Sequence, residues 1–409
     1  MRAAGVICEY NPFHKGHALH LAQTREQLGP DCGVVCVMSG NYVQRGEPAL
    51  FGKHARAEAA VLGGADLVLE LPLPWAAAPA ERFAAGGVAL LDRLGVCTYL
   101  SFGSEAGTLA PLLRAAEALR DPSIDLKIRA ALADGASYAA ARQAAVQALI
   151  GPDAAVLTEP NNILAVEYLL ALAARGSKMK PLTMSRTGAA HNGLLPESGL
   201  ASASHIRSLF ASGGDPWPYL AGPAAARFRK EMEAGRGPVL LEALETAMLA
   251  RLRTLPDEAF AALPGNAEGL SDRLRRNART EPDLRSVLDK TVTRRYPRSR
   301  IRRMLLCAYL GVTAADQTGE PPYARVLALN GRGRGLLREI QKNGKIPVLT
   351  KPAAAVQLPA DAARIFRLEA LATDLYVLGY PSAAERAGGA EWKTSPVILE
   401  EESEQCAYC

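Results

Sequence analysis

Short apolar runs alternate with segments of helical periodicity along the first two hundred residues of the chain. The apolar runs are uninterrupted stretches of mainly Val, Leu, Ile and Cys, which is typical of parallel strands that are covered on both faces. The pattern therefore predicts a Rossmann-like, doubly wound α/β domain. The expected strands are residues 4–10, 33–39, 66–72, 97–103 and 179–186, and the expected helices are 17–27, 53–64, 80–94, 161–174 and one that starts at 202.

The alternation of strands and helices is interrupted once and then ends. An Ala-rich stretch at about 105–150 indicates a helical insert, and the alternation stops at the Gly-Gly-Asp-Pro sequence of residues 213–216. Residues 240–255 and the Arg-rich stretch that follows have helical patterns, and the tail after 321 mixes helix and strand patterns. We expect a catalytic α/β domain at 1–215, a helical Arg-rich region at 216–320, and a mixed α/β region with a flexible tail at 321–409.

Composition indicates a soluble, multi-domain protein. The chain has 409 residues, of which 49% are apolar and 22% are charged, and it has no run of eighteen apolar residues that could span a membrane. The apolar start of the chain meets Glu9 early, so it predicts a first strand and not a secretory signal, and we expect a cytoplasmic protein. Seven cysteines, mostly in apolar runs, predict buried thiols without disulfides. Cys406 and Cys409 have the spacing of half a zinc site, but a functionless tail is favoured because no second pair follows.

Positive charge is concentrated in one segment. The net charge is only +5, yet residues 273–303 carry twelve Lys and Arg against three acidic residues. A solvated helix face is the ordinary explanation for such a run. The density of charge and the interleaved Tyr296 indicate instead a polyanionic partner.

The turn after the first strand contains the sequence NPFHKGH, residues 11–17. In an open α/β sheet, ligands bind at the carboxyl ends of the strands, and a helix that begins there directs N–H groups and positive partial charge toward phosphate. Gly16 lets the backbone come close, and His14 and His17 can donate hydrogen bonds to phosphoryl oxygens. The alternative, that these histidines only cap the helix, is less favoured for a pair in this position. A zinc-protease site needs histidines four apart beside a Glu, so metal binding is set aside.

These residues resemble the H-x-G-H motif of the nucleotidylyltransferase superfamily, and SASHIR at 202–207 resembles its second phosphate-binding element. GVICEYNPFHKGH, VMSGNYVQRGEPAL, GADLVLELP, FGSE, PNNILAVEYL and SASHIR, in this order, are similar to the bacterial tRNA(Met) cytidine acetate ligase family. Matching segments also occur after residue 290, so the resemblance covers nearly the whole chain. One departure is that Ser204 and His205 replace a Ser-Thr arrangement, which leaves the role of Ser202 less defined than that of Arg207.

The resemblance implies an enzyme that forms acetyl-adenylate from acetate and ATP and transfers the acetyl group to N4 of the wobble cytidine of elongator tRNA(Met). It implies His14 and His17 as catalytic residues. The implied ATP-binding residues are Tyr10, Asn11, Pro12, Phe13, His14, Gly16, His17, Gly103, Asn161, Asn162, Arg186, Ser202 and Arg207. The expected tRNA-binding residues are Arg294, Arg295, Arg298, Arg300, Arg302 and Arg303, and a basic loop at 330–345 extends that surface. Mg²⁺ commonly accompanies ATP, but no carboxylate cluster in the sequence nominates a ligand.

Several residues keep two interpretations. Lys53 and Arg56 are candidates for the triphosphate or a solvated helix face. Tyr42, Gln44 and Arg45 either close over a substrate or belong to an ordered loop. For Asn161, Asn162 and Ser202 the alternative is a helix cap, and for Gly103 it is a tight turn. Asp66 and Glu70 are expected in the core, His20 in packing, and His191 is undecided. The competing functions are a small-molecule adenylyltransferase, which would not need the Arg-rich half, and an RNA-binding module that binds ATP without chemistry.

Overall fold

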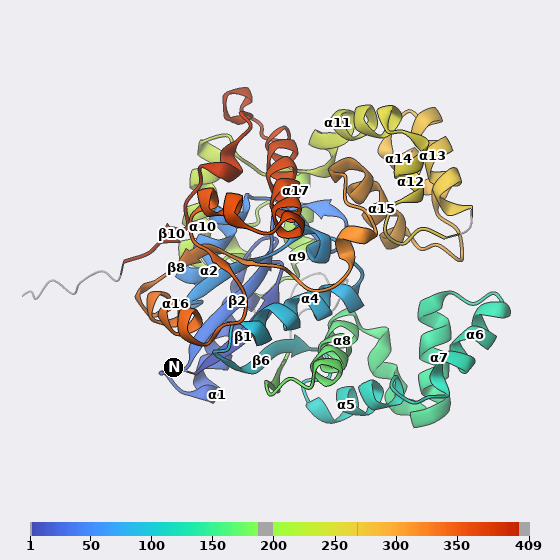
Figure 1. Ribbon diagram of the computed structural model, residues 1–409, viewed down its shortest axis with the longest axis horizontal. Coiled ribbons are helices and arrows are strands. Elements are labelled where there is room, and N and C mark those ends of the chain that lie inside the picture. Colours follow the sequence, from blue (N-terminus) through green and yellow to red (C-terminus); the bar gives the residue numbers. More distant parts are fainter. Residues whose placement is uncertain (1, 187–198, 268, 401–409) are drawn as a thin grey trace, which may run out of the picture.

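A computed structural model of the chain describes residues 2–186, 199–267 and 269–400. Its centre is one large mixed sheet with helices on both faces (Figure 1). The strands lie in the order β10, β8, β5, β2, β1, β6, β7, and β9 pairs with β8. Their bounds are β1 Ala3–Cys8, β2 Gly33–Ser39, β5 Leu67–Leu71, β6 Cys97–Ser104, β7 Lys180–Ser185, β8 Ala324–Leu329, β9 Val348–Leu349 and β10 Val397–Ile398.

The five strands of the first half are parallel, as expected, and β1 is central between β2 and β6. Alternate residues of β2 enter different cores: Val35 and Val37 pack on one face of the sheet, whereas Val34 and Cys36 pack on the other. Each face needs apolar side chains, which explains the uninterrupted apolar sequence of these strands. The predicted doubly wound fold is confirmed, with helices α1, α2 and α10 against one face and α4 and α8 on the other.

The helices of this part follow the predicted order. Their bounds are α1 Lys15–Leu28, α2 Lys53–Leu62, α3 Leu73–Ala76, α4 Ala80–Arg93, α8 Pro160–Arg175, α9 Ala203–Ser212 and α10 Gly222–Glu233. The expected insert is helical and forms α5 Leu109–Ala118, α6 Ile124–Ala133 and α7 Tyr138–Ile150, which extend to one side of the sheet in Figure 1.

A second group of helices forms another projection at the upper right of Figure 1. It contains α11 Leu241–Thr254, α12 Asp257–Ala261, α13 Leu270–Thr280, α14 Leu284–Thr291 and α15 Arg298–Leu310, and it includes the Arg-rich stretch. Short 3-10 helices connect elements at Gly151–Thr158, Trp217–Tyr219, Ala315–Gln317, Pro352–Gln357, Ala383–Glu385 and Ala390–Trp392. No described helix is both long and apolar enough to cross a bilayer.

The last quarter of the chain returns to the sheet. Strand β8 pairs antiparallel with β5, and α16 (Gly331–Asn343) packs against it. Phe366 of α17 (Ala360–Val377) stacks with Arg325 of β8 at 5.5 Å. Residues beyond 320 therefore extend the sheet formed by the first 215, which the local apolar pattern did not indicate. The division of the chain at 215 and 320 stays a prediction.

Candidate functional site

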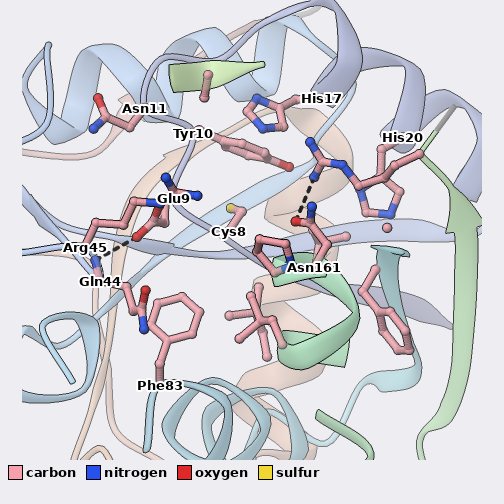
Figure 2. A pocket seen from close by; sticks show the side chains of 18 of the residues that line it. Cys8, Glu9, Tyr10, Asn11, His17, His20, Gln44, Arg45, Phe83 and Asn161 are labelled. Carbon is pink, nitrogen blue, oxygen red and sulfur yellow. Dashed lines mark hydrogen bonds between the residues drawn. The ribbon is translucent and has the colours of Figure 1, made fainter. Parts of the chain in front are cut away.

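A cleft opens at the carboxyl ends of β1 and β6, where the topology of the sheet predicts a ligand. It encloses about 250 Å³, and a smaller recess of about 70 Å³ adjoins it. Four residues line both spaces, namely His17, His20, Gly103 and Arg186. Figure 2 shows the side chains around the larger space.

The two histidines of the H-x-G-H motif form the first turn of α1. His14 is the N-cap residue, and its Nδ1 accepts a hydrogen bond from the Gly16 N–H at 3.1 Å. The His17 Nδ1 accepts from the His14 N–H at 3.3 Å, and the two rings stack with centroids 3.6 Å apart. The helix therefore begins at Lys15, two residues earlier than predicted, because His14 supplies the cap.

Burial favours the neutral form of both imidazoles. Burial lowers the pKa of His14 to about 3, with help from the charges of Arg186 and Arg207, and burial also lowers the pKa of His17 well below its usual range. Since each Nδ1 accepts a hydrogen bond, the single ring proton lies on Nε2. The Nε2 of His14 is buried and has no partner among the described residues. The pair therefore offers N–H donors at a helix N-terminus, which is suited to phosphoryl oxygens.

The loop between β1 and α1 contains both residues that line the cleft and residues that do not. Tyr10 and Asn11 line the cleft, and Tyr10 has a left-handed backbone with φ of 47°. The Asn11 Oδ1 accepts from the Leu50 N–H at 2.8 Å. Pro12 and Phe13 do not line the cleft. The Phe13 ring packs so closely against Gly63, the C-cap residue of α2, that a Cβ at Gly63 would lie 2.3 Å from the ring.

On the β6 side, Gly103 makes room for a cation. A Cβ at Gly103 would lie 2.9 Å from the Cγ of Arg186, so the glycine lets this side chain cross the end of the strand. Arg186 donates to the Asn161 Oδ1 at 3.3 Å, and a dashed line at the labelled Asn161 marks this bond in Figure 2. Glu105 in turn accepts from the Asn161 side chain at 2.5 Å and from the Asn162 N–H at 2.9 Å. Asn162 lies outside the cleft, and its side chain binds the Ala106 N–H.

Helix α9 adds a second cation. Its N-cap Ser202 lines the cleft and accepts from the His205 N–H at 3.2 Å. Arg207 donates to the Asn11 carbonyl at 3.1 Å and to the Ser204 hydroxyl at 3.2 Å. Burial lowers the pKa of Arg207, as it does for Arg186. These contacts hold both guanidinium groups at the cleft.

A hairpin formed by β3 (Tyr42–Val43) and β4 (Glu47–Pro48) borders the cleft. Gln44 and Arg45 line it, whereas Tyr42 is buried against Tyr376. The Gln44 N–H donates to the Glu9 Oε1 at 2.7 Å. Of the two interpretations of this loop, the lining role therefore fits Gln44 and Arg45, and the structural role fits Tyr42.

The same hairpin touches the Arg-rich helix. Glu47 forms an ion pair with Arg302 of α15, and it lies 3.9 Å from the Arg207 Nε. Gly46 is so close to the Arg302 backbone that a Cβ there would lie 2.8 Å from its carbonyl carbon. One short hairpin thus connects the cleft to the basic segment.

Some of the predicted tRNA-binding arginines are exposed, and others already bind groups of the protein. Arg294 and Arg295 are exposed just before α15. Arg298 pairs with Asp289, and Arg300 donates to the Gly265 carbonyl and stacks over Tyr296 at 5.1 Å. Burial lowers the pKa of Arg303. Part of this charge therefore holds the helices together, and the role of the six residues in RNA binding stays a prediction.

Lys53 and Arg56 are neither at the cleft nor on a solvated face, so both interpretations of them were wrong. Lys53 is 2% exposed, and its Nζ lies 2.7 Å from carboxylate oxygens of both Glu70 and Glu391. Arg56 is fully buried and donates to backbone carbonyls, including those of Phe51 and Ser39. Glu391 is 338 residues from Lys53 in the sequence, so the pattern of neighbouring residues could not identify this network.

The remaining candidates are placed as follows. Asp66 and Glu70 are buried in the core, as expected. His20, expected only to pack, lines the cleft and bonds to the Ser101 Oγ at 2.9 Å. Cys8, Cys32, Cys36, Cys97 and Cys307 are free thiols. His191, Cys406 and Cys409 lie outside the described residues.

Glu9 is a lining residue that we did not select from the sequence. The sequence does contain a signal for it, because Glu9 is the charged residue that directly follows an apolar strand at the ligand edge of the sheet. The aromatic residues Phe83, Phe102 and Tyr168 were also missed, because apolar lining residues and core residues have the same local pattern.

The chain is similar to known proteins over most of its length. The HIGH Nucleotidyl Transferase family model matches residues 1–391. A tRNA(Met) cytidine acetate ligase of Acetivibrio thermocellus is 36% identical, covering 98% of this chain and all of the relative. One of Syntrophotalea carbinolica is 40% identical, covering 86% of this chain and 85% of the relative.

Solved structures are also similar over nearly the full length. The crystal structure of Thermotoga maritima TmcAL bound with alpha-thio ATP is 32% identical and has a TM-score of 0.90. An apo form of the same protein has a TM-score of 0.92. In both cases the similarity covers 98% of this chain and all of the other.

Proposed function

The chain belongs to the tRNA(Met) cytidine acetate ligase family of HIGH nucleotidyl transferases, and from this premise we propose that it acetylates N4 of the wobble cytidine of elongator tRNA(Met) with acetate and ATP. One observation carries the proposal. The stacked His14 and His17 present Nε2–H donors at the N-terminus of α1, beside a cleft lined by Arg186 and Arg207.

In the first half-reaction, an acetate oxygen attacks the α-phosphorus of ATP. A new P–O bond forms, the bond to the β-phosphate oxygen breaks, and pyrophosphate leaves. Negative charge accumulates on the phosphoryl and pyrophosphate oxygens, so fixed donors aimed at them lower the barrier. His14 and His17 supply neutral N–H donors, and Arg186 and Arg207 supply charged ones. The protein mainly positions the groups and stabilises charge.

In the second half-reaction, the cytidine N4 attacks the carbonyl carbon of acetyl-adenylate. The N–C bond forms, the bond from carbon to the phosphate oxygen breaks, and AMP leaves while the nitrogen loses a proton. The cytidine has to leave the stack of its anticodon loop to reach the cleft, as is common when single-stranded RNA is recognised. A tRNA ligase of this kind is expected to act in the cytoplasm.

The Arg-rich segment provides the surface for the RNA backbone in this proposal. Arg294 and Arg295 are exposed, and α15 reaches the cleft through Glu47. Phosphate contacts of this type supply much of the affinity of RNA-binding proteins. A small-molecule adenylyltransferase would make no use of this surface.

Magnesium would accompany ATP as its usual counter-ion. Within residues 2–186, 199–267 and 269–400, no group of three or more His, Cys, Asp or Glu side chains is placed to hold a metal ion.

The first half-reaction is tested by ATP–pyrophosphate exchange in the absence of tRNA. The proposal predicts exchange that requires acetate and is not supported by pantetheine phosphate or nicotinamide mononucleotide. Exchange that requires one of these small molecules would favour the adenylyltransferase. If the protein binds ATP but shows no exchange with acetate or any other carboxylic acid tested, an RNA-binding module that binds ATP without chemistry is favoured.

A further inference from the structure

Glu9 is electrostatically out of place in a site for two anions. Among the described residues that line the cleft, it is the only carboxylate, and Arg45, Arg186 and Arg207 are the cations. A carboxylate repels both the phosphates of ATP and acetate. Its chemistry suits a ligand that donates hydrogen bonds.

The structure fixes the carboxyl group but leaves one oxygen available. Glu9 Oε1 accepts from the Gln44 N–H at 2.7 Å, which Figure 2 draws as a dashed line. Among the hydrogen bonds of the described residues, none involves Oε2. The residue is partly exposed, and it directly follows β1 at the edge where ligands bind. Oε2 can therefore accept a hydrogen bond from a bound group.

The hairpin that holds Glu9 also faces the proposed RNA surface. Gln44 binds Glu9, Arg45 donates to the Ser204 hydroxyl at 3.3 Å, and Glu47 pairs with Arg302 of α15. A nucleotide that approaches from α15 meets this hairpin before it reaches the stacked histidines. Glu9 thus lies between the hairpin that contacts α15 and the stacked histidines proposed to bind ATP.

We propose that Glu9 accepts a hydrogen bond from the N4 amine of the target cytidine and then takes its proton during acetyl transfer. This inference rests on the proposed function. The amine nitrogen forms its bond to the acetyl carbon, the carbon–oxygen bond to AMP breaks, and the N–H proton moves to Glu9 Oε2 and from there to water. No further reactant is needed.

The charged surroundings of Glu9 are consistent with a proton acceptor. Burial raises the pKa of Glu9, whereas Arg45 of the hairpin, the Gln44 N–H, Arg207 of α9 and Arg56 of α2 each lower it. The net effect is a raised pKa, and a base is more effective when its pKa lies closer to the working pH.

The test separates the two half-reactions in the Glu9→Gln variant, which keeps the size of the side chain and an oxygen for the Gln44 N–H. We expect acetate-dependent ATP–pyrophosphate exchange to stay within about threefold of the wild type. We expect the single-turnover rate of acetyl transfer to tRNA to fall by about 10² to 10⁴-fold, the range for loss of a general base. The rise of the wild-type transfer rate with pH should disappear in the variant.

The matched control is Glu58→Gln, which makes the same change at a carboxylate that pairs with Arg227 outside the cleft. It should leave both half-reactions unchanged. Glu9→Asp, which retains a carboxylate, should recover part of the transfer rate and its pH dependence. If Glu9→Gln lowers the midpoint of thermal unfolding, recovery of transfer in Glu9→Asp still distinguishes loss of the base from loss of stability.

The alternative donors are the ribose hydroxyls and the amino group of ATP. If Glu9 binds these, Glu9→Gln will raise the KM for ATP in the exchange assay, and the proposal is then overturned. Unchanged transfer in the variant would also overturn it. Absence of acetate-dependent exchange in the wild type would instead show that the proposed function itself is wrong.

Discussion

The His14 ring combines a helix cap with the donor to which we assign a role in catalysis. Its Nδ1 caps α1, and its buried Nε2 lacks a partner in the part of the chain described here. The sequence supports both interpretations of the histidines, a cap or a phosphate ligand, and the geometry shows that they are compatible. The positions of side chains beside the cleft were predictable where a motif marked them, as at His14 and His17. The position of Lys53 was not predictable, because its partners are distant in sequence.

The two roles of His14 can be separated by substitution. Asparagine is a good N-cap, so His14→Asn should keep stability within about 0.5 kcal/mol, whereas His14→Ala should lose about 1 kcal/mol with the cap. Both variants lack the Nε2–H donor, and loss of one such donor typically costs about 10² to 10³-fold in rate. We expect acetate-dependent exchange to fall to this extent in both, as measured beside urea unfolding. Normal exchange by His14→Asn would mean that the ring only caps the helix.

At the scale of elements, the β3–β4 hairpin connects the α/β domain predicted at 1–215 with the Arg-rich region predicted at 216–320. The apolar pattern predicted the strands and helices of the first half, because their periodicity is local. It did not predict that Gly46 and Glu47 pack on α15, since that contact joins residues about 255 apart and depends on the tertiary fold. It also could not distinguish the exposed arginines from those in internal ion pairs.

The exposed arginines provide the test at this scale. Arg294→Gln with Arg295→Gln should raise the KM for tRNA and reduce the salt dependence of tRNA binding by about one to two counterions. ATP–pyrophosphate exchange should be unchanged. Lys127→Gln with Arg129→Gln on α6, which removes two exposed positive charges from a different projection, is the charge-matched control and should bind tRNA normally. Equal tRNA affinity in all three proteins would place the RNA surface elsewhere.

At the scale of the whole molecule, a buried charge network joins the end of the chain to the sheet. Lys53 binds Glu70 and Glu391, Thr373 donates to Glu391 at 2.6 Å, and Glu369 of α17 accepts from the Leu73 N–H. Arg325 of β8 also pairs with Glu391, so three buried carboxylates share two buried cations, Lys53 and Arg325. Burial, with the charge of Glu70, accordingly raises the pKa of Glu369 to about 8. Such a network can be recognised only once β8 and α17 are in place.

This network predicts a pH-dependent stability. Between the unfolded pKa of 4.5 and the folded pKa of about 8, the folded state keeps a proton on Glu369 that the unfolded state has released. The free energy of unfolding should therefore fall as pH rises through this window. Glu369→Gln cannot ionise, so in urea titrations from pH 5 to 9 its stability should fall less steeply than that of the wild type. The exposed Glu258→Gln is the control. A wild-type slope in Glu369→Gln would contradict this role.

The most direct test of the account follows the acetyl group to the RNA. The protein is incubated with ATP, isotopically labelled acetate and unmodified elongator tRNA(Met), and the digested RNA is examined by mass spectrometry. The account predicts labelled N4-acetylcytidine at the wobble position, only when ATP and acetate are both present, and none with a tRNA whose wobble base is uridine. Acetate-dependent ATP turnover without any acetylated cytidine would contradict the assignment of tRNA as the acceptor.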